Sequence, residues 1–249
     1  MEPHKLIMNL SIDIGNSKVK LAVFKADKLV EVSSFLKKDL LSALGKIKDK
    51  HSIKNAILAT VSGLNEEVLD EIKGMFSLVL VDADLKFPFQ IKYKTKGTLG
   101  VDRLALIAAA VAKYPNKNVL VIDAGTCITY DFKTKDEDYL GGAIAPGVLM
   151  RYKALNNQTA NLPFLETQYP KNIVGDSTKQ AIHSGVCLGV IFEIEGVISQ
   201  YMAKNRDLTV VLTGGDTNFL AEKLKSGIFA NPIFLLEGLN HILNHNLQE

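Results

Sequence analysis

Residues 10–17 read Leu-Ser-Ile-Asp-Ile-Gly-Asn-Ser, and residues 120–127 repeat the outline as Leu-Val-Ile-Asp-Ala-Gly-Thr-Cys. In both copies an apolar run ends at an aspartate, and a glycine follows shortly after it. This pattern predicts a buried strand that ends in a tight turn. A second apolar run follows each turn, at 19–24 and 128–132, and predicts the returning strand of a hairpin. The chain is therefore a duplication built on two hairpins.

The hydrophobic period changes after each hairpin. Helical spacing alternates with short apolar runs in both halves, which predicts an α/β layer with a mixed sheet in each. The helices are expected at 40–47, 65–73, 177–202, 218–225 and 237–247, and the strands at 56–61, 77–81, 208–212 and 228–229. Pro115 stops a helix just before the second copy, so we expect one domain over 1–115 and another over 116–249.

Composition excludes several classes of protein. The chain has 249 residues, 47% of them hydrophobic, and a formal net charge of +2. This near balance gives no reason to expect nucleic acid as a partner. Two cysteines suit a reducing compartment. The longest apolar stretch, 104–112, is shorter than the roughly 20 residues that span a bilayer, and no targeting pattern is evident. We expect a cytoplasmic protein without a membrane partner.

The two Asp-x-Gly turns predict a phosphate clamp. Glycine allows the sharp turn in which successive backbone N–H groups converge on a phosphate oxygen. An aspartate before such a turn can hold a cation directly or through water. The hydroxyls of Ser17 and Thr126 add donors, and Lys20 could reach a β- or γ-phosphate. The alternative is that both are purely structural hairpin turns.

Further candidates lie outside the hairpins. Asp102 starts an apolar helical pattern, and from the residues alone an N-cap is the favoured interpretation of an aspartate there. Gly185 and Gly189 share one face of the long helix and allow close approach of another helix, either within the chain or in a dimer. Cys127 has no histidine near it in sequence and is interpreted as a small core side chain.

Four segments together resemble the type III pantothenate kinases, a branch of the acetate kinase, sugar kinase, Hsp70 and actin superfamily. They are 13–17 with Lys20, the Gly-x-Asp-Arg at 100–103, the second hairpin at 122–126, and Gly-Gly-Ala-Ile-Ala-Pro-Gly at 141–147. The chain departs from the family pattern in two places. Ser17 stands where Thr is more common, and 94–99 lacks the proline expected after Tyr93.

The resemblance implies a fold of duplicated ribonuclease H-like (actin-like) domains, each a mixed β-sheet flanked by helices, with a cleft between them. The N-terminal domain, 1–115, would carry the first phosphate hairpin and the Gly-x-Asp-Arg helix. The C-terminal domain, 116–249, would carry the second hairpin and the long helix, and the last helix could pack back on the N-terminal domain.

The resemblance also implies an activity, the ATP-dependent phosphorylation of pantothenate to 4'-phosphopantothenate in coenzyme A biosynthesis. Asp102 would be the general base. Mg²⁺ would bind Asp13 through water, and a monovalent cation, K⁺ or NH₄⁺, would bind Asp123. By the same resemblance the protein would be a homodimer with a shared active site.

Two groups of binding residues follow from the matched motifs. The ATP-binding group is Asp13, Ile14, Gly15, Asn16, Ser17, Lys18, Val19, Lys20 and Thr126. The substrate-binding group is Tyr93, Gly100, Val101, Asp102, Arg103 and Thr178. Alternative functions are a regulatory or accessory binding protein of the same fold, or a kinase for another small hydroxy acid.

Overall fold

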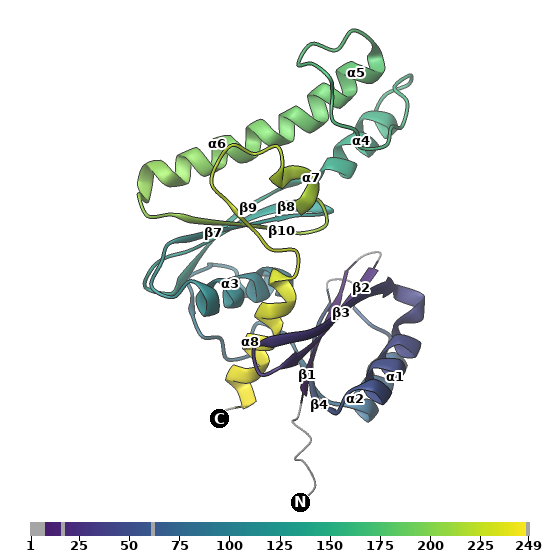
Figure 1. Ribbon diagram of the computed structural model, residues 1–249, viewed down its shortest axis with the longest axis vertical. Helices are drawn as coiled ribbons and strands as arrows, with labels where there is room; N and C mark the ends of the chain where they lie inside the picture. The colour runs from purple at the N-terminus through teal and green to yellow at the C-terminus, as the bar shows by residue number, and fades with distance from the viewer. Residues whose placement is uncertain (1–7, 16–17, 61–62, 248–249) are drawn as a thin grey trace, which may run out of the picture. The chain divides into compact units, whose positions relative to one another are not determined.

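The computed structural model describes residues 8–15, 18–60 and 63–247. The chain divides into two compact units (Figure 1). Unit 1 contains residues 1–115, 137–139 and 233–249, and unit 2 contains residues 116–136 and 140–232.

Unit 1 is built on a five-stranded sheet in the order β3-β2-β1-β4-β5. Its strands are β1 (Met8–Ile14), β2 (Lys18–Lys25), β3 (Lys28–Leu36), β4 (Ile53–Thr60) and β5 (Ser77–Leu80). The central strand β1 runs antiparallel to β2 and parallel to β4, and β4 runs parallel to β5. The first hairpin thus lies at the centre of the sheet.

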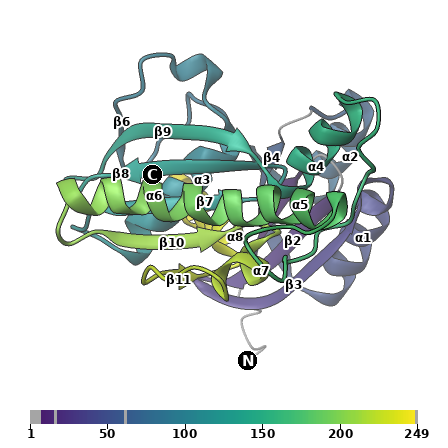
Figure 2. The same cartoon turned by 90° about the horizontal axis from the view of Figure 1, so that it is seen from above.

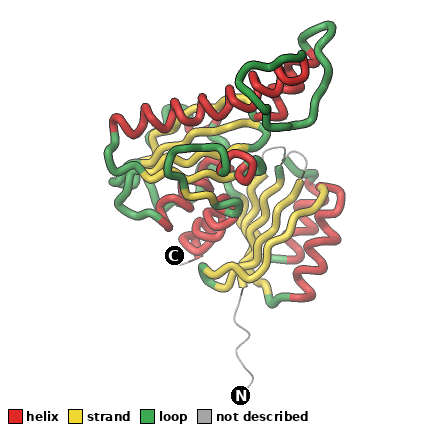
Figure 3. Tube along the Cα trace, turned by 45° about the horizontal axis from the view of Figure 1, so that its top comes forward, coloured by secondary structure: helices red, strands yellow, loops and turns green. Residues whose placement is uncertain are grey.

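Helices cover both faces of this sheet because its central strands alternate between two apolar faces. Leu10, Ile12 and Ile14 of β1 pack with α1 (Leu40–Lys50) and α2 (Glu66–Met75). Ile57 and Ala59 of β4 pack instead with α3 (Val101–Lys113) and α8 (Phe234–Leu247). Figure 3 shows α1 and α2 as red helices beside the yellow strands.

Unit 2 repeats the strand order of unit 1. Its strands are β7 (Val119–Ala124), β8 (Cys127–Lys133), β9 (Asp138–Pro146), β10 (Thr209–Thr213) and β11 (Phe229–Ala230), and the order β9-β8-β7-β10-β11 mirrors β3-β2-β1-β4-β5. The directions agree as well, since β7 is antiparallel to β8 and parallel to β10. A short strand, β6 (Gln90–Ile91), pairs with Asp138 and Tyr139 at the start of β9.

The helices of unit 2 share one core with its sheet. They are α4 (Val148–Asn157), α5 (Thr178–His183), a π-helical segment (Ser184–Leu188), α6 (Gly189–Lys204) and α7 (Thr217–Ala221). Figure 2 shows α6 running along the strands of this unit. The run 178–204 is long and apolar enough to cross a membrane by length and composition, but 50% of its most apolar window is buried in the fold.

The expected α/β fold with two mixed sheets is confirmed, and every helix and strand expected after the hairpins is present within a few residues. Sequence reasoning missed β3 and β9, the third strand of each sheet, and also α4. Polar residues interrupt β3 along its whole length, and none of its residues is fully buried, so it lacks the apolar run that marked the other strands.

Candidate active site

The first hairpin joins β1 to β2. Its register pairs Asp13 with Lys20 across the two strands, and the Gly15 N–H donates to the Lys18 carbonyl oxygen at 3.1 Å. Ile14 and Val19 form the last pair, and their side chains are fully buried, so only their backbone could contact a nucleotide. Two of the expected ATP-binding residues, Asn16 and Ser17, lie outside the described residues.

Unit 1 brings three ionisable side chains together around this hairpin. Burial raises the pKa of Asp13 to about 6, the charge of Lys20 opposes that shift, and the carboxylate of Asp102 adds to it. Asp102 comes from α3, so the Gly-x-Asp-Arg helix lies near enough to the hairpin for its carboxylate to influence Asp13. A buried carboxylate with a raised pKa and a second carboxylate near it form an environment that a hydrated divalent cation would stabilise.

Asp102 does not cap its helix. Gly100 occupies the N-cap position of α3, where no side chain provides a capping hydrogen bond. The Asp102 Oδ1 instead accepts from the Arg103 N–H at 2.8 Å, and a side chain at Gly100 would overlap this oxygen. The Oδ2 atom of Asp102 has no hydrogen-bond partner among the described residues. The N-cap interpretation is therefore wrong, and one carboxylate oxygen is left to accept a proton.

Arg103 and Tyr93 lie against each other. The Arg103 guanidinium carbon is 5.5 Å from the centre of the Tyr93 ring, and Arg103 is only 5% exposed. Tyr93 stacks in turn on Tyr139, with ring centres 6.4 Å apart and planes 6° from parallel. The arginine is thus positioned by an aromatic face and is not a solvated helix arginine.

The loop between Tyr93 and α3 is shaped without a proline. A 3₁₀ turn, η2 (Lys96–Thr98), closes it through the Leu99 N–H, which donates to the Lys96 carbonyl oxygen at 3.1 Å. The Thr98 hydroxyl adds a bond to the Thr95 carbonyl oxygen at 3.0 Å. These local bonds define a turn where the family pattern has proline.

The second hairpin has the same frame but different side chains. Asp123 pairs with Thr129, which takes the place that Lys20 has opposite Asp13. The Gly125 N–H donates to the Cys127 carbonyl oxygen at 2.9 Å. Asp123 is half-buried and Thr126 is exposed. This hairpin has no lysine opposite its aspartate.

Two glycines pack directly on the second hairpin. The Gly147 N–H donates to the Thr126 carbonyl oxygen at 3.0 Å, and a side chain at Gly147 would overlap the carbonyl oxygen of Gly125. Gly214 has a φ of 99°, and a side chain there would overlap the Asp123 carboxylate and the Ala124 carbonyl oxygen. Both glycines are therefore needed for close packing on the second hairpin.

Asp216 lies on the loop after β10, and no role for it follows from the sequence. Its N–H donates to the Ala124 carbonyl oxygen at 2.9 Å, which ties the loop after β10 to the second hairpin. Burial raises the pKa of its carboxyl group. The only sequence signal was its place after Gly214 and Gly215.

Thr178 opens α5 in unit 2. The preceding Ser177 is the N-cap, and its hydroxyl accepts from the Gln180 N–H at 3.4 Å. Thr178 itself is exposed, and its hydroxyl has no hydrogen-bond partner among the described residues. The helix-cap role therefore belongs to Ser177, and the Thr178 hydroxyl is left for another contact.

Neither of the two positions at which a cation is expected, Asp13 and Asp123, carries a cluster of metal-ligating side chains in the described residues. No group of three His, Cys, Asp or Glu side chains that could hold a metal ion is found in the described part of the chain. A cation at Asp13 or Asp123 would take its other ligands from phosphate oxygens, backbone carbonyls and water, which suits Mg²⁺ and K⁺ better than Zn²⁺.

Solved structures share the fold at low sequence identity. A protein described as a Baf family transcriptional activator from Campylobacter jejuni aligns with a TM-score of 0.65 and 23% identity, over 96% of this chain and 100% of that one. The apo pSK41 ParM protein aligns with a TM-score of 0.52 and 9% identity, over 98% of each chain. The second alignment places the fold among actin-like proteins.

Sequence comparisons identify the family. The type III pantothenate kinase family model matches residues 9–200. The type III pantothenate kinase of Christiangramia forsetii is 49% identical over 240 residues, which are 96% of this chain and 99% of that protein. The enzyme of the same name from Bacteroides fragilis is 43% identical over 240 residues, 96% of this chain and 98% of its own length. These matches show that the chain belongs to the type III pantothenate kinase family.

Proposed function

We propose that this chain transfers the γ-phosphoryl group of ATP to the primary hydroxyl of pantothenate and forms 4'-phosphopantothenate. One observation carries the proposal. Asp102, the candidate base, interacts electrostatically with Asp13, as does Lys20 of the first phosphate hairpin. Such a group supplies the alignment and the charge neutralisation that phosphoryl transfer requires.

The first hairpin would hold the phosphates of ATP. The Lys20 ammonium neutralises phosphate charge, and the Gly15 turn brings the backbone close. Mg²⁺ would bind near Asp13 through water and would spread the charge of the β- and γ-phosphates. Binding of the cation is expected to lower the pKa of Asp13, because an opposite charge favours the ionised carboxylate.

Asp102 would accept the proton of the attacking hydroxyl. Its Oδ1 is fixed by the Arg103 N–H, so Oδ2 can be directed at the substrate. A carboxylate is a weak base, but the hydroxyl loses its proton late in a loose transition state. The role therefore needs position more than basicity.

Arg103 would bind the carboxylate of pantothenate. Its guanidinium stacks on Tyr93 and is held at the N-terminus of α3, where the helix dipole also favours an anion. Tyr93 thus acts by orienting the arginine. Gly100 and Val101 would line the same end of the helix, and Thr178 would contribute its unpartnered hydroxyl.

Unit 2 would supply the remaining contacts. Thr126 is exposed at the tip of the second hairpin and could donate to a phosphate, and Asp123 could hold K⁺ or NH₄⁺. We propose that the two units correspond to the expected actin-like domains, with the last helix, α8, in unit 1. The free thiols of Cys127 and Cys187 support a cytoplasmic location, since they suit a reducing compartment.

A homodimer is supported by the surface of unit 2. Ile144 is 63% exposed and Phe192 is 58% exposed, and Phe192 lines an apolar cavity of about 500 Å³ with Val197 and Tyr201. A side chain at Gly185 or Gly189 would meet no atom of the described residues within 4 Å. This space favours contact with a second copy over an internal helix crossing at these glycines. Light scattering should give a dimer that Phe192→Ser weakens and Val30→Ser, a change on β3, does not.

The test of the function is a coupled ADP-release assay with ATP and Mg²⁺, run with and without pantothenate, in potassium and in sodium buffer. Pantothenate-dependent turnover that needs potassium would support both the reaction and the cation role of Asp123. Turnover without potassium dependence would remove that role alone. Without any pantothenate dependence the proposal fails, and other hydroxy acids or a binding role would follow.

A further inference from the structure

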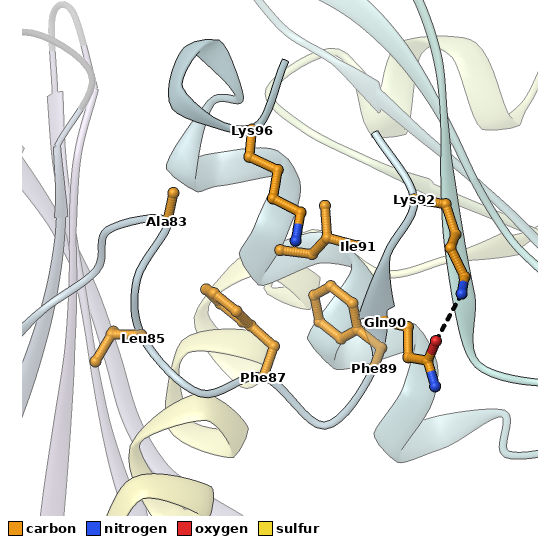
Figure 4. Close-up of a pocket in the computed structure, with 8 residues that line it drawn as sticks. All are labelled: Ala83, Leu85, Phe87, Phe89, Gln90, Ile91, Lys92 and Lys96. Atoms are coloured by element: carbon orange, nitrogen blue, oxygen red, sulfur yellow. Dashed lines mark hydrogen bonds between the residues drawn. The ribbon is translucent and has the colours of Figure 1, made fainter. Parts of the chain in front are cut away.

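Besides the cavity of unit 2, a cavity in unit 1 lies outside the groups assigned to the reaction. It has a volume of about 450 Å³ and is formed by the segment between Ala83 and Lys96 (Figure 4). Small-molecule sites occupy about 300–1,000 Å³, so this cavity is large enough for a compact ligand. None of the described residues assigned to ATP or pantothenate lines it.

One side of the cavity is apolar and aromatic. Phe87 and Phe89 lie with ring centres 5.2 Å apart and planes inclined by 38°, and Ile91 lies beside them. Phe89 is 8% exposed, which fixes its ring in the core. Such a surface favours a ligand with a flat or branched apolar body.

The other side carries one available positive charge. Figure 4 shows the Lys96 side chain directed toward the phenyl rings. Its amine has no hydrogen bond or ion pair with any described residue. Lys92, the other lysine of the lining, is directed away and donates to the Gln90 Oε1 at 2.6 Å, with Asp138 at 3.6 Å.

Among the described residues, no acidic side chain lines the cavity to neutralise Lys96. Asp82 and Asp84 flank the lining residue Ala83 without lining the cavity themselves. Asp82 is used in its own turn, where its Oδ1 accepts from the N–H groups of Asp84 and Leu85 at 2.9 and 3.0 Å. An unpaired ammonium above apolar rings is complementary to an anion with an apolar body.

From this arrangement we propose that the cavity binds a small carboxylate with an aromatic or branched apolar body. The carboxylate would pair with Lys96, and the apolar body would pack on Phe87 and Phe89. No covalent chemistry is involved, and the site is distinct from the catalytic group around Asp13.

The cavity is coupled to the substrate residues through a row of rings. Phe89 meets Tyr139 edge to face, with centres 6.3 Å apart, and Tyr139 stacks on Tyr93, which supports Arg103. Lys96 also begins the turn that leads to α3. A ligand that shifts these groups should change KM for pantothenate, and this consequence alone rests on the proposed function.

The binding test uses phenylacetate as the probe, with isothermal titration of the whole protein. We expect a Kd on the order of 0.1–1 mM. Phenylacetamide lacks the charge and acetate lacks the ring, so each should bind at least about tenfold more weakly. No heat of binding up to about 10 mM phenylacetate, or equal binding of the amide, would overturn the proposal.

Variants locate the site. Lys96→Gln should weaken phenylacetate at least about tenfold, and Phe87→Ala should weaken it severalfold. Lys92→Gln is the matched control, since its amine is already bonded to Gln90 and faces away, and it should leave the Kd unchanged. Equal losses in the two lysine variants would overturn the assignment, because they would report net charge and not this cavity.

A kinetic assay tests the coupling of the cavity to the substrate residues separately from ligand binding at the cavity. In the pantothenate assay, phenylacetate should change KM in the wild type and not in Lys96→Gln, with little change in kcat. Binding that leaves KM unchanged would overturn the coupling through Tyr93. Binding in a protein that shows no kinase activity would overturn the proposed function and still support the site.

Discussion

The two hairpins have the same topology and use it differently. Each is the central antiparallel pair of a sheet with the same strand order, and each ends in Asp-x-Gly. The first pairs its aspartate with Lys20, whereas the second pairs its aspartate with Thr129 and is packed by Gly147. The same topology thus carries a group of charged side chains in unit 1 and a hairpin closely packed by glycine in unit 2.

The largest effect on kcat is expected from substitution of Asp102, whose carboxylate interacts electrostatically with Asp13 of the first hairpin. Asp102→Asn keeps the size of the side chain and removes the proposed base, so kcat should fall about 10³-fold with little loss of stability. Asp70→Asn, on α2 and paired with Lys73 at the surface, is the control and should leave kcat unchanged. If turnover of Asp102→Asn stayed near that of the control, another group would have to be the base.

The second largest difference is expected between substitutions of the cross-strand partners of the two aspartates, Lys20 and Thr129. Lys20→Met should lower kcat/KM for ATP about 100-fold, because the ammonium is lost from the phosphate site. Thr129→Val at the equivalent position should have little effect, since the buried Thr129 hydroxyl has no hydrogen-bond partner among the described residues. Steady-state kinetics of both variants test this, and comparable losses would remove the distinction between the hairpins.

Alanine substitutions of one glycine on each hairpin test the difference in steric packing between the two hairpins. Gly147→Ala would push a methyl group into the Gly125 carbonyl oxygen, and overpacking of this kind costs about 2–3 kcal/mol in free energy of unfolding. Gly15→Ala on the first hairpin meets the Lys18 carbonyl oxygen at 3.3 Å and should cost under about 1 kcal/mol. Urea unfolding measures both. A larger loss for Gly15→Ala would contradict the steric account of the second hairpin.

The smallest expected effect concerns stability and pH. The pKa of Asp13 is raised to about 6, so the folded state binds this proton more tightly than the unfolded chain does. The wild type should therefore lose stability as pH rises from about 4 to about 6, in total about 2–3 kcal/mol from this group. Asp13→Asn should be more stable than the wild type at pH 8 by about 2 kcal/mol and no more stable near pH 4.

Urea unfolding at the two pH values measures that difference. Activity should be lost in Asp13→Asn while stability is gained, which is the pattern expected of a strained functional group. A variant that is less stable than the wild type at pH 8 would show that the carboxylate is held by favourable contacts and not against burial.

Much of this fold could be predicted because its signals are local. The repeated Asp-x-Gly, with an apolar run on each side, is enough to predict both hairpins, and helical spacing predicts α1, α2, α6 and α8. The Gly-x-Asp-Arg resemblance directed attention to Asp102 and Arg103, which the structure places at the start of α3. Each of these inferences needs only neighbours along the chain.

The rest depends on contacts between distant segments. Asp102 resembled an N-cap in sequence, and only the position of Gly100 and the bond to the Arg103 N–H show that it is not. Nothing in the sequence near Arg103 indicates that Tyr93 covers its guanidinium. Lys96 is exposed like an ordinary loop lysine, and its position beside Phe87 and Phe89 could not be read from the sequence.

The interaction among Asp13, Lys20 and Asp102 can be tested directly by an NMR titration of the Asp13 carboxyl carbon in the protein without nucleotide. The account predicts a pKa near 6 that falls in Asp102→Asn, where a like charge is removed, and rises in Lys20→Met, where an opposing charge is removed. A pKa near 4 that neither variant moves would contradict the claim that these three groups form one charged site.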